Sequence, residues 1–430
     1  MFVHRAPFSE ACLANYRPLV GPEVVDRIQR LAEPVRGARV LHINATAIGG
    51  GVAELLFSLV PLMRDAGLDV DWYVLDAHER FFDVTKGFHN ALQGFAGSWS
   101  QEAFQIYWDG CADNARRLAR AWRDYDFIIV HDPQPLVLRS LLPHDGIWIW
   151  RCHIDLTSPN LEVWNRLSPH LALYDMAVFS APEYVPSDLE VDHVGIAMPA
   201  IDPFRPKNRP IRADDATRIP AEYGVDPLRP YLLQVSRFDP WKDPVGVVEV
   251  YRRIKAERPE MQLVYMASMA HDDPEAWRVY EETRAAAGSD PDIHLLALEV
   301  PHDQIARNAL EVNAMQRGAR VILQKSIREG FGLVVTEALW KEKPVVAGDV
   351  GGIRYQVRNG WNGYLVSSVD ECAERVLELL RDPELSADFG RRGRETVRSS
   401  FLMTRLLEEH LVWFNQLTGN RVATATPSAP

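Results

Sequence analysis

The sequence predicts an α/β protein with two Rossmann-like domains. Its 430 residues exceed what one hydrophobic core usually serves. Short apolar strands alternate with helical patterns, which is typical of parallel sheets covered on both faces. This alternation breaks once, over the proline-rich stretch 201–230, and then restarts. We therefore expect an N-terminal domain over residues 1–205, a linker over 206–230 and a C-terminal domain over 231–399.

The first half begins with a predicted strand, helix and strand at residues 39–43, 52–62 and 70–75. A long helical pattern over 104–123 then precedes an apolar strand at 127–130. Further short strands are expected at 147–152, 176–180 and 191–196. Strands and helices in this order predict a parallel sheet.

The second half repeats the pattern. Its predicted strands are 231–236, 262–267, 293–297, 320–323 and 344–347. Its predicted helices are 245–257, 274–287, 304–317, 334–342, 370–381 and 384–398. A last helix, about 400–418, is expected to return to the first domain. Residues 423–430 are small and polar with two prolines, so a loose tail is expected there.

Composition narrows the range of partners. The net charge is −12, with 47 basic and 59 acidic residues, which argues against nucleic acid or an anionic membrane as a partner. No apolar run approaches a membrane span, and residues 1–11 lack the apolar core of a signal peptide. Four scattered cysteines show neither metal-ligand nor redox spacing, which fits the cytoplasm. The histidines show no metal pattern, so no structural metal is predicted.

The segment from Arg328 to Glu337 reads Arg-Glu-Gly-Phe-Gly-Leu-Val-Val-Thr-Glu and places carboxylates at Glu329 and Glu337. Glycines allow close approach of a ligand, and the helix start after them suits a phosphate. Carboxylates accept hydrogen bonds from sugar hydroxyls. The segment therefore predicts a sugar-nucleotide site. The alternative interpretation is a buried strand-to-helix turn with two surface acids.

A second segment, Gln234 to Asp243, follows a predicted strand and carries Arg237 and Lys242. Ligands of open α/β sheets bind at the carboxyl ends of strands. Two cations five residues apart can clamp a diphosphate, arginine as a fork and lysine as a point charge. The alternative is a solvated basic pair on a surface loop, although the aromatic and proline residues around it favour a held loop.

Three further clusters lie at strand ends. The turn Gly49–Gly51 can bring ligand oxygens to backbone N–H groups, or it is simply a tight turn. His131–Pro135 and Arg151–Asp155 each follow a strand, and within them His153 is a candidate donor to a sugar hydroxyl or a structural histidine. His271–Asp273 either lies near a nucleotide or caps the helix that follows it.

The segments Gln234–Asp243 and Arg328–Glu337, together with Gly351-Gly352-Ile353, resemble motifs of the retaining glycosyltransferases related to glycogen and sucrose-phosphate synthases. That resemblance implies a GT-B type fold, in which two Rossmann-like domains face a central cleft. The first half is similar to the trehalose glycosyltransferring synthases over Asn44–Glu54, Phe82–Gly94, His131–Pro135 and Trp150–Leu156. Those enzymes join glucose from a nucleoside-diphosphate glucose to free glucose. Trehalose phosphorylases share much of the pattern, so phosphate in place of the nucleotide is the nearest rival.

The resemblance also implies roles for individual residues. Arg237 and Lys242 would hold the donor diphosphate, and Glu337 the ribose. Glu329 would hold the donor glucose, and His153 would contact that sugar near its C6 hydroxyl. The remaining donor-side residues would be Gly330, Phe331, Gly332, Leu333, Gly50 and Gly51. The candidates on the acceptor side are Asn44, Asp132, Gln134, Arg151 and Asp155.

Retention implies attack on the face of the leaving group, because Glu329 is assigned to sugar hydroxyls and no other carboxylate is placed as a nucleophile. The implied donor is ADP-, UDP- or GDP-glucose, and no other cofactor is required. Mg²⁺ can assist a diphosphate, but no acidic motif demands it. The partners are small sugars, and a homodimer is suggested by analogy alone. An epimerase, an oxidoreductase lacking its glycine fingerprint and a non-catalytic sensor are the alternatives from other classes.

Overall fold

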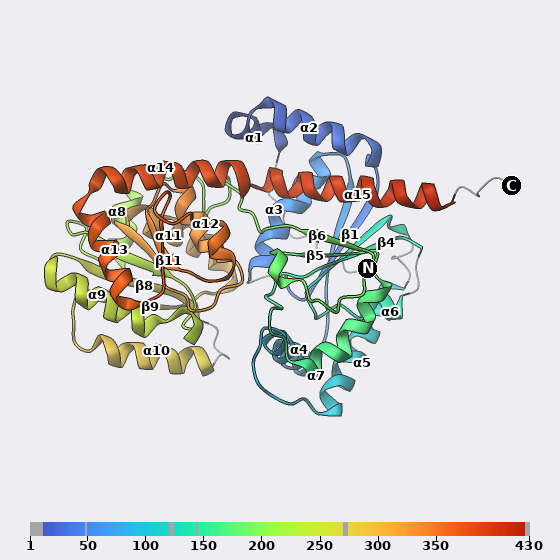
Figure 1. Cartoon of the computed structure of the whole chain (residues 1–430), viewed down its shortest axis with the longest axis horizontal. Coiled ribbons are helices and arrows are strands. Elements are labelled where there is room, and N and C mark those ends of the chain that lie inside the picture. The colour runs from blue at the N-terminus through green and yellow to red at the C-terminus, as the bar shows by residue number, and fades with distance from the viewer. Residues whose placement is uncertain (1–11, 48–49, 120–123, 143–144, 270–273, 426–430) are drawn as a thin grey trace. The chain divides into compact units, whose positions relative to one another are not determined.

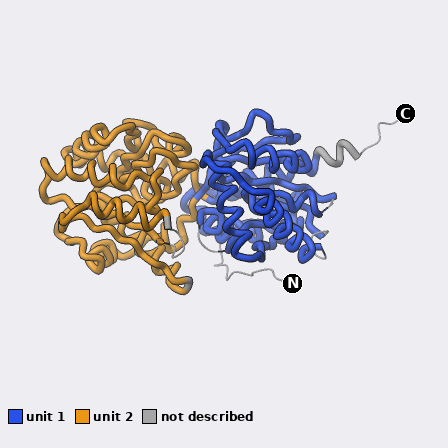
Figure 2. The backbone as a smooth tube through the Cα atoms, turned by 90° about the horizontal axis from the view of Figure 1, so that it is seen from below, with its two compact units in different colours: residues 1–200, 403–430 blue, residues 201–402 orange. Residues whose placement is uncertain are grey.

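The computed structural model describes residues 12–47, 50–119, 124–142, 145–269 and 274–425 (Figure 1). The chain divides into two compact units, shown in different colours in Figure 2. Unit 1 comprises residues 1–200 and 403–430, and unit 2 comprises residues 201–402. Each unit contains a parallel sheet with helices, so the predicted class of two Rossmann-like α/β domains is confirmed.

The described part of unit 1 contains a six-stranded sheet in the order β2-β1-β3-β4-β5-β6, with every neighbouring pair parallel. Its strands are β1 Arg39–Asn44, β2 Asp69–Val74, β3 Phe127–His131, β4 Ile147–Arg151, β5 Met176–Phe179 and β6 His193–Ile196. All residues of β3 and β4 are buried. Residues 127–130 and 147–150 are unbroken apolar runs, which are typical of parallel strands covered on both faces.

The α-helices of unit 1 are α1 Leu13–Val20, α2 Pro22–Ala32, α3 Gly51–Asp65, α4 Glu79–Leu92, α5 Gln101–Leu118, α6 Leu138–Leu141, α7 Leu161–Leu167 and α15 Met403–Ala425. The 3₁₀ turns in the described part of this unit are η1 Glu33–Val35, η3 Ser168–Leu173 and η4 Pro182–Tyr184. Helices α1, α2, α4, α6 and α7 were not predicted from the sequence.

Helix α15, near the end of the chain, packs against elements from the first part of unit 1. The ring of Phe414 stacks on that of Phe127 in β3, with centroids 4.2 Å apart. The amide of Asn415 donates to the carbonyl of Leu31 in α2 at 2.8 Å. The helix extends to residue 425, three residues into the segment expected as a tail, and residues 426–430 lie outside the described part of the chain.

The described part of unit 2 contains a second six-stranded parallel sheet, in the order β12-β11-β10-β7-β8-β9. Its strands are β7 Tyr231–Val235, β8 Gln262–Met269, β9 Ile293–Glu299, β10 Val321–Gln324, β11 Val345–Gly348 and β12 Tyr364–Val366. The short strand β12 was not predicted from the sequence.

The α-helices of unit 2 are α8 Asp215–Glu222, α9 Pro244–Glu257, α10 Pro274–Ala287, α11 Ile305–Gly318, α12 Leu333–Trp340, α13 Val369–Arg381 and α14 Pro383–Ser400. Its 3₁₀ turns are η5 Pro240–Lys242, η6 His302–Gln304 and η7 Gly351–Tyr355. Residues 206–230, expected as a linker, belong to unit 2 and include α8.

In each sheet the first strand of the unit in chain order is an interior strand, with a neighbour on both sides. In unit 1, β1 pairs with β2 on one side and β3 on the other. In unit 2, β7 pairs with β8 on one side and β10 on the other. Strand order therefore reverses at β1/β3 and at β7/β10. In such sheets ligands bind beyond the carboxyl ends of the strands at the reversal.

Candidate functional site

The loop after β7 is held in shape by its own side chains and by Tyr265 of the neighbouring strand β8. Phe238 is fully buried and stacks on Tyr265 of β8, with ring centroids 4.7 Å apart. The Tyr265 hydroxyl donates to the carbonyl oxygen of Arg237 at 3.1 Å. The Arg237 side chain itself is 65% exposed and lies 3.1 Å from the Asp239 carboxylate. The loop thus presents an accessible guanidinium on an anchored backbone.

The next residue after η5 is conformationally unusual. Asp243 has a φ of +48°, in the left-handed region that few non-glycine residues adopt. Its carboxylate caps α9 by accepting from the backbone N–H of Gly246 at 3.1 Å. The ammonium of Lys325, which follows β10, pairs with the same carboxylate. A capping acid therefore ties the loop after β7 to the loop after β10.

The central contact of the site joins Lys242 and Glu329. The ammonium nitrogen of Lys242 lies 2.8 Å from Oε2 of Glu329, and both side chains are largely buried, at 14% and 11% exposed. Gln324 donates to the same oxygen at 3.3 Å, and Ser326 at 3.2 Å. Three donors therefore converge on one carboxylate oxygen at the β7/β10 reversal.

The backbones of the two loops are also joined. The N–H of Ile327 donates to the carbonyl of Trp241 at 2.8 Å. The guanidinium of Arg328 lies over the Trp241 ring, 5.1 Å from its centroid. The side-chain carbonyl of Gln234, in β7, accepts from the backbone N–H of Lys325 at 3.0 Å. These contacts fix the two loops relative to each other.

Glycine is required at one position within the Gly-Phe-Gly turn and at one position of the segment that contacts this turn. Gly332 caps α12 with a φ of +81°. Gly352 donates to the carbonyl of Gly330 at 3.2 Å, and a Cβ on Gly352 would lie 2.5 Å from that oxygen. The carbonyl of Phe331 accepts from Gln356 at 2.5 Å. Leu333 is the first residue of α12, so its N–H belongs to the open end of the helix.

The second acid of the segment, Glu337, lies in α12 and is only 3% exposed. Its carboxylate lies 3.5 Å from the amide nitrogen of Gln316 and 3.6 Å from the ammonium of Lys207. Lys341, one turn later, donates to Gln316 at 2.6 Å and to the carbonyl of Glu337 at 3.2 Å. Burial lowers the pKa of Lys341. The two acids of the motif thus occupy different environments.

In unit 1, Gly50 caps α3 with a φ of +87°, and a Cβ there would meet open space. Gly51 is the first residue of α3, and Gly49 lies outside the described residues. Asn44, at the end of β1, is buried, accepts from Trp72 at 2.7 Å and donates to the carbonyl of Thr46 at 2.6 Å. Its amide therefore holds the backbone at Thr46, directly after β1.

Asp132 organises the ends of β3 and β4. It has a φ of +64°, and its carboxylate accepts from the backbone N–H of His153 at 2.8 Å. Its own N–H donates to the carbonyl of Arg151 at 2.9 Å. Burial raises the pKa of Asp132 to about 6. The structure thus brings together three of the residues singled out at these strand ends.

The other candidates of unit 1 make internal contacts. Arg151 is 2% exposed and donates to the carbonyls of Cys152 and Ala197, and burial lowers its pKa to about 10. Asp155 accepts from the N–H and the hydroxyl of Thr157 at 2.8 and 2.6 Å. The backbone carbonyl of Gln134 accepts from the thiol of Cys111 at 3.3 Å. Arg151 therefore serves the backbone of its own unit.

Sequence reasoning missed the polar shell around the two acids. Gln324, Lys325 and Ser326 form a polar run directly after an apolar strand, which was an available signal. Gln316 lies within α11 and Lys341 directly follows α12, and the sequence offers no signal of what either side chain contacts. The cluster His271–Asp273 lies outside the described residues.

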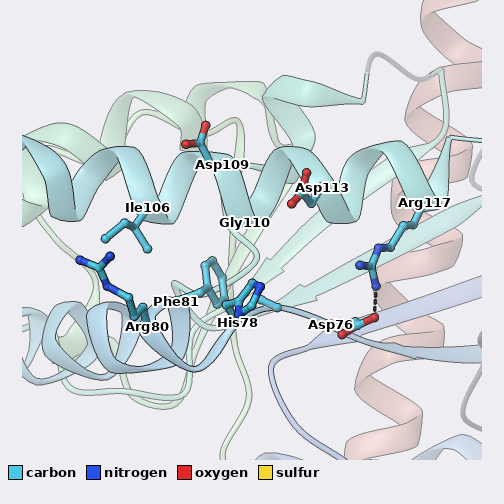
Figure 3. Close-up of a pocket in the computed structure, with 10 residues that line it drawn as sticks. Asp76, His78, Arg80, Phe81, Ile106, Asp109, Gly110, Asp113 and Arg117 are labelled. Atoms are coloured by element: carbon cyan, nitrogen blue, oxygen red, sulfur yellow. Dashed lines mark hydrogen bonds and ion pairs between the residues drawn. The ribbon is translucent and has the colours of Figure 1, made fainter.

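A hollow of about 480 Å³ lies elsewhere in unit 1, between α4 and α5 (Figure 3). None of the predicted site residues lines it. Asp76 and Arg117 on its wall pair with each other, and Arg80 pairs with Glu102. Among the described residues no group of three metal-ligating side chains could hold an ion. No helix in the same ranges is long and apolar enough to cross a membrane.

Comparisons with known proteins indicate one family, the trehalose synthases. Residues 42–186 match the family model of the trehalose synthase N-terminal domain, and residues 215–396 match that of glycosyl transferases group 1. The trehalose synthase of Rubrobacter xylanophilus is 50% identical over 410 residues, covering 95% of this chain and 97% of that protein. The trehalose synthase of Pyrococcus horikoshii is 43% identical over 408 residues, with coverage of 95% and 97%.

More distant relatives share the fold or part of their length. The trehalose phosphorylase of Pleurotus pulmonarius is 30% identical over 435 residues, covering 88% of this chain and 58% of that protein. The solved trehalose 6-phosphate synthase of Burkholderia multivorans superposes with a TM-score of 0.72 at 16% identity, over 92% of this chain and all of that one. The sucrose-phosphate synthase of Thermosynechococcus elongatus gives 0.67 at 16% identity, over 90% and 100%.

Proposed function

Because this chain belongs to the trehalose synthase family and is a glycosyltransferase, we propose that it transfers glucose from a nucleoside-diphosphate glucose to free glucose and forms trehalose with retention. Family membership carries the reaction type and its relation to trehalose. The donor, the acceptor and the roles of individual residues are part of the proposal.

One observation carries the proposal furthest, namely the contact between Lys242 and Glu329 at the β7/β10 reversal. A cation for phosphate and an acceptor for sugar hydroxyls lie side by side where the fold favours ligand binding. Gly332 and the open start of α12 are adjacent to Glu329 in the chain. A hexose linked to a diphosphate needs this combination of groups within a few ångströms.

The proposed roles follow from chemistry. Arg237 and Lys242 bind the diphosphate, and Lys242 has three N–H donors, so it can hold Glu329 and a phosphate oxygen together. Glu329 accepts from hydroxyls of the donor glucose, and Glu337 from those of the ribose. Lys325, which pairs with Asp243, adds a third cation to the same pair of loops.

The proposed step breaks the bond between the anomeric carbon and the phosphate oxygen, and the bonding electrons leave with the diphosphate. The hydroxyl oxygen of the acceptor glucose bonds to the anomeric carbon on the same face. Its proton passes to the departing phosphate oxygen. Arg237 and Lys242 stabilise the growing charge, and Glu329, held by three donors, fixes the hexose while the ring is cationic.

The test is an incubation of the purified chain with ADP-, UDP- and GDP-glucose, each with and without glucose. NMR of the products is expected to show an α,α-linked disaccharide only when glucose is present. An α,β-linked product would contradict retention. A donor changed without acceptor would indicate an epimerase, and binding without turnover a sensor. Parallel reactions with EDTA measure any need for Mg²⁺.

A second candidate activity comes from the Pleurotus pulmonarius relative, a trehalose phosphorylase. Here phosphate would replace the nucleotide beside Arg237 and Lys242. Incubation of trehalose with phosphate, and separately with each nucleoside diphosphate, distinguishes the two. Glucose released only with a nucleoside diphosphate supports the proposal, and glucose 1-phosphate supports the phosphorylase. The same arms show whether the reaction runs in both directions.

A further inference from the structure

Three histidines from three neighbouring strands form a continuous row in unit 1. His42 lies within β1, His131 ends β3, and His153 follows β4 by two residues. Nδ1 of His42 lies 3.0 Å from Nε2 of His131, and Nδ1 of His131 lies 2.9 Å from Nε2 of His153. His42 and His131 are fully buried, whereas His153 is partly exposed.

The inner end of the row has a defined polarity. Nε2 of His42 lies 3.4 Å from the sulfur of Met63, in α3. A thioether can only accept a hydrogen bond, so the proton of His42 belongs on Nε2. Nδ1 of His42 then accepts from Nε2 of His131, and Nδ1 of His131 accepts from Nε2 of His153. Nδ1 of His153 is left as the acceptor of its ring.

The rings carry one proton each. Burial lowers the pKa of His42, His131 and His153 well below 6.5, and the neighbouring positive Arg151 lowers the pKa of the last two further. A neutral imidazole has one donor and one acceptor. The Nε2–H tautomer that Met63 imposes on His42 therefore determines the tautomer of His131, and that of His131 determines the tautomer of His153. The backbone of His153 is fixed separately, by the Asp132 carboxylate.

We propose that His42 and His131 are positioning residues that hold His153 in its Nε2–H tautomer, so that Nδ1 accepts a hydrogen bond from a substrate hydroxyl. This direction is the reverse of the donation by His153 that the sequence led us to expect. The ligand class follows, because a hydroxyl can donate to Nδ1 and a carboxylate, ether or fluorine cannot. Only the identity of that substrate, a hexose with its C6 hydroxyl here, rests on the proposed function.

The direct test is ¹⁵N NMR of the full chain with ¹⁵N-labelled histidine, where the ring nitrogens of each tautomer have distinct shifts. The variant His153→Gln identifies the signals of His153 by their loss. The wild type is expected to show His153 with its proton on Nε2. Met63→Leu keeps the volume but removes the sulfur acceptor, so a mixture of both tautomers at His153 is expected.

Met176→Leu is the matched control, since Met176 is a buried methionine of β5 in the same unit. It is expected to leave the His153 signals as in the wild type. A proton on Nδ1 of His153 in the wild type would overturn the proposal. So would His153 signals in Met63→Leu that do not differ from those in Met176→Leu.

A kinetic test uses a donor with fluorine in place of the C6 hydroxyl. The wild type is expected to lose roughly tenfold in kcat/KM with this donor, because Nδ1 of His153 is left unpaired when the bound donor covers it. In His131→Phe the ratio between the two donors is expected to fall toward one. If His153 has the expected tautomer but no donor yields disaccharide, the proposed function is contradicted and the proposed role of the histidine row is supported. If disaccharide forms while His153 carries its proton on Nδ1, the proposed role of the histidine row is wrong and the proposed function is not contradicted.

Discussion

The ammonium nitrogen of Lys242 and the carboxylate oxygen Oε2 of Glu329 lie 2.8 Å apart, although the residues are 87 positions apart in the chain. The contact exists because β7 and β10 are neighbours in the sheet. In the proposed reaction Lys242 therefore has two functions, since it holds the acid that binds the hexose and faces the diphosphate that leaves.

Replacing Lys242 by alanine is expected to lower kcat by about 10²–10³, the usual cost of removing one preorganised donor. Because Lys242 also holds Glu329, the double variant with Glu329→Gln should lose less than the product of the single losses. Steady-state kinetics on the three variants measure this. The control is Lys255→Ala, a lysine of unit 2 paired with Asp290 and Asp292, which should keep full activity.

Substitution of the two acids of the motif should affect different kinetic parameters. Glu329→Gln is expected to lower kcat most, because Glu329 holds the reacting sugar. Glu337→Gln is expected mainly to weaken donor binding, because Glu337 is assigned to the ribose. Separate measurement of kcat and of donor affinity by calorimetry distinguishes them. The reverse pattern would contradict the assignment of both residues.

Gly352→Ala should damage the site through backbone contact alone. Its Cβ would lie 2.5 Å from the carbonyl oxygen of Gly330 and 2.6 Å from Cα of Phe331, so the turn must shift. A loss of roughly 1–3 kcal/mol in the free energy of unfolding is expected, with lower activity. Gly419→Ala, at an exposed position of α15 with open space around it, should be neutral or stabilising by about 1 kcal/mol. Denaturant unfolding of both variants checks the contrast.

Buried histidines should make unit 1 sensitive to acid. Burial lowers the pKa of His410, in α15, from 6.5 to about 4. Between these values the unfolded chain binds a proton that the folded chain does not. The free energy of unfolding therefore falls as the pH drops from about 6.5 toward 4, and the contribution is constant above 6.5. His42, His131 and His153 act in the same direction.

The variant His410→Gln isolates this effect, because an amide can donate to the carbonyl of Leu406 as His410 does at 2.7 Å. Its stability should fall less than that of the wild type over the same window, by on the order of 3 kcal/mol at pH 4. Asp132, whose pKa is raised by burial, acts in the opposite direction in both proteins and cancels in the comparison. Parallel curves for the two proteins would contradict the prediction.

Most of the fold could be predicted from the sequence, because its buried strands are short apolar runs between turn signals. Residues 127–130 and 147–150 are unbroken apolar runs, and a single buried polar residue, His131 or Arg151, ends each strand. β12 was missed because it has only three residues, and α8 was missed because Pro220 and the charges around it indicate a loop. Local sequence does not reveal that such segments are stabilised by neighbours.

The candidate site could be predicted only in part. Arg237, Lys242 and Glu329 stand out because charged residues follow apolar strands at the ends where ligands bind. The sequence does not show that Lys242 contacts Glu329, because that contact depends on strand order. His42 was missed for a related reason, since a single histidine inside an apolar strand has no partner until β1 and β3 are paired.

Helix α15 has a consequence for the way the polypeptide is made. The ribosome delivers β1 to β6 first, then all of unit 2, and only afterwards the segment carrying Phe414 and His410. Phe127 lacks its stacking partner, and His42 lacks its neighbour from the last helix, until translation is nearly finished. The earliest-synthesised half of the nascent protein is thus the last to complete its interior, and it must wait while the other half folds.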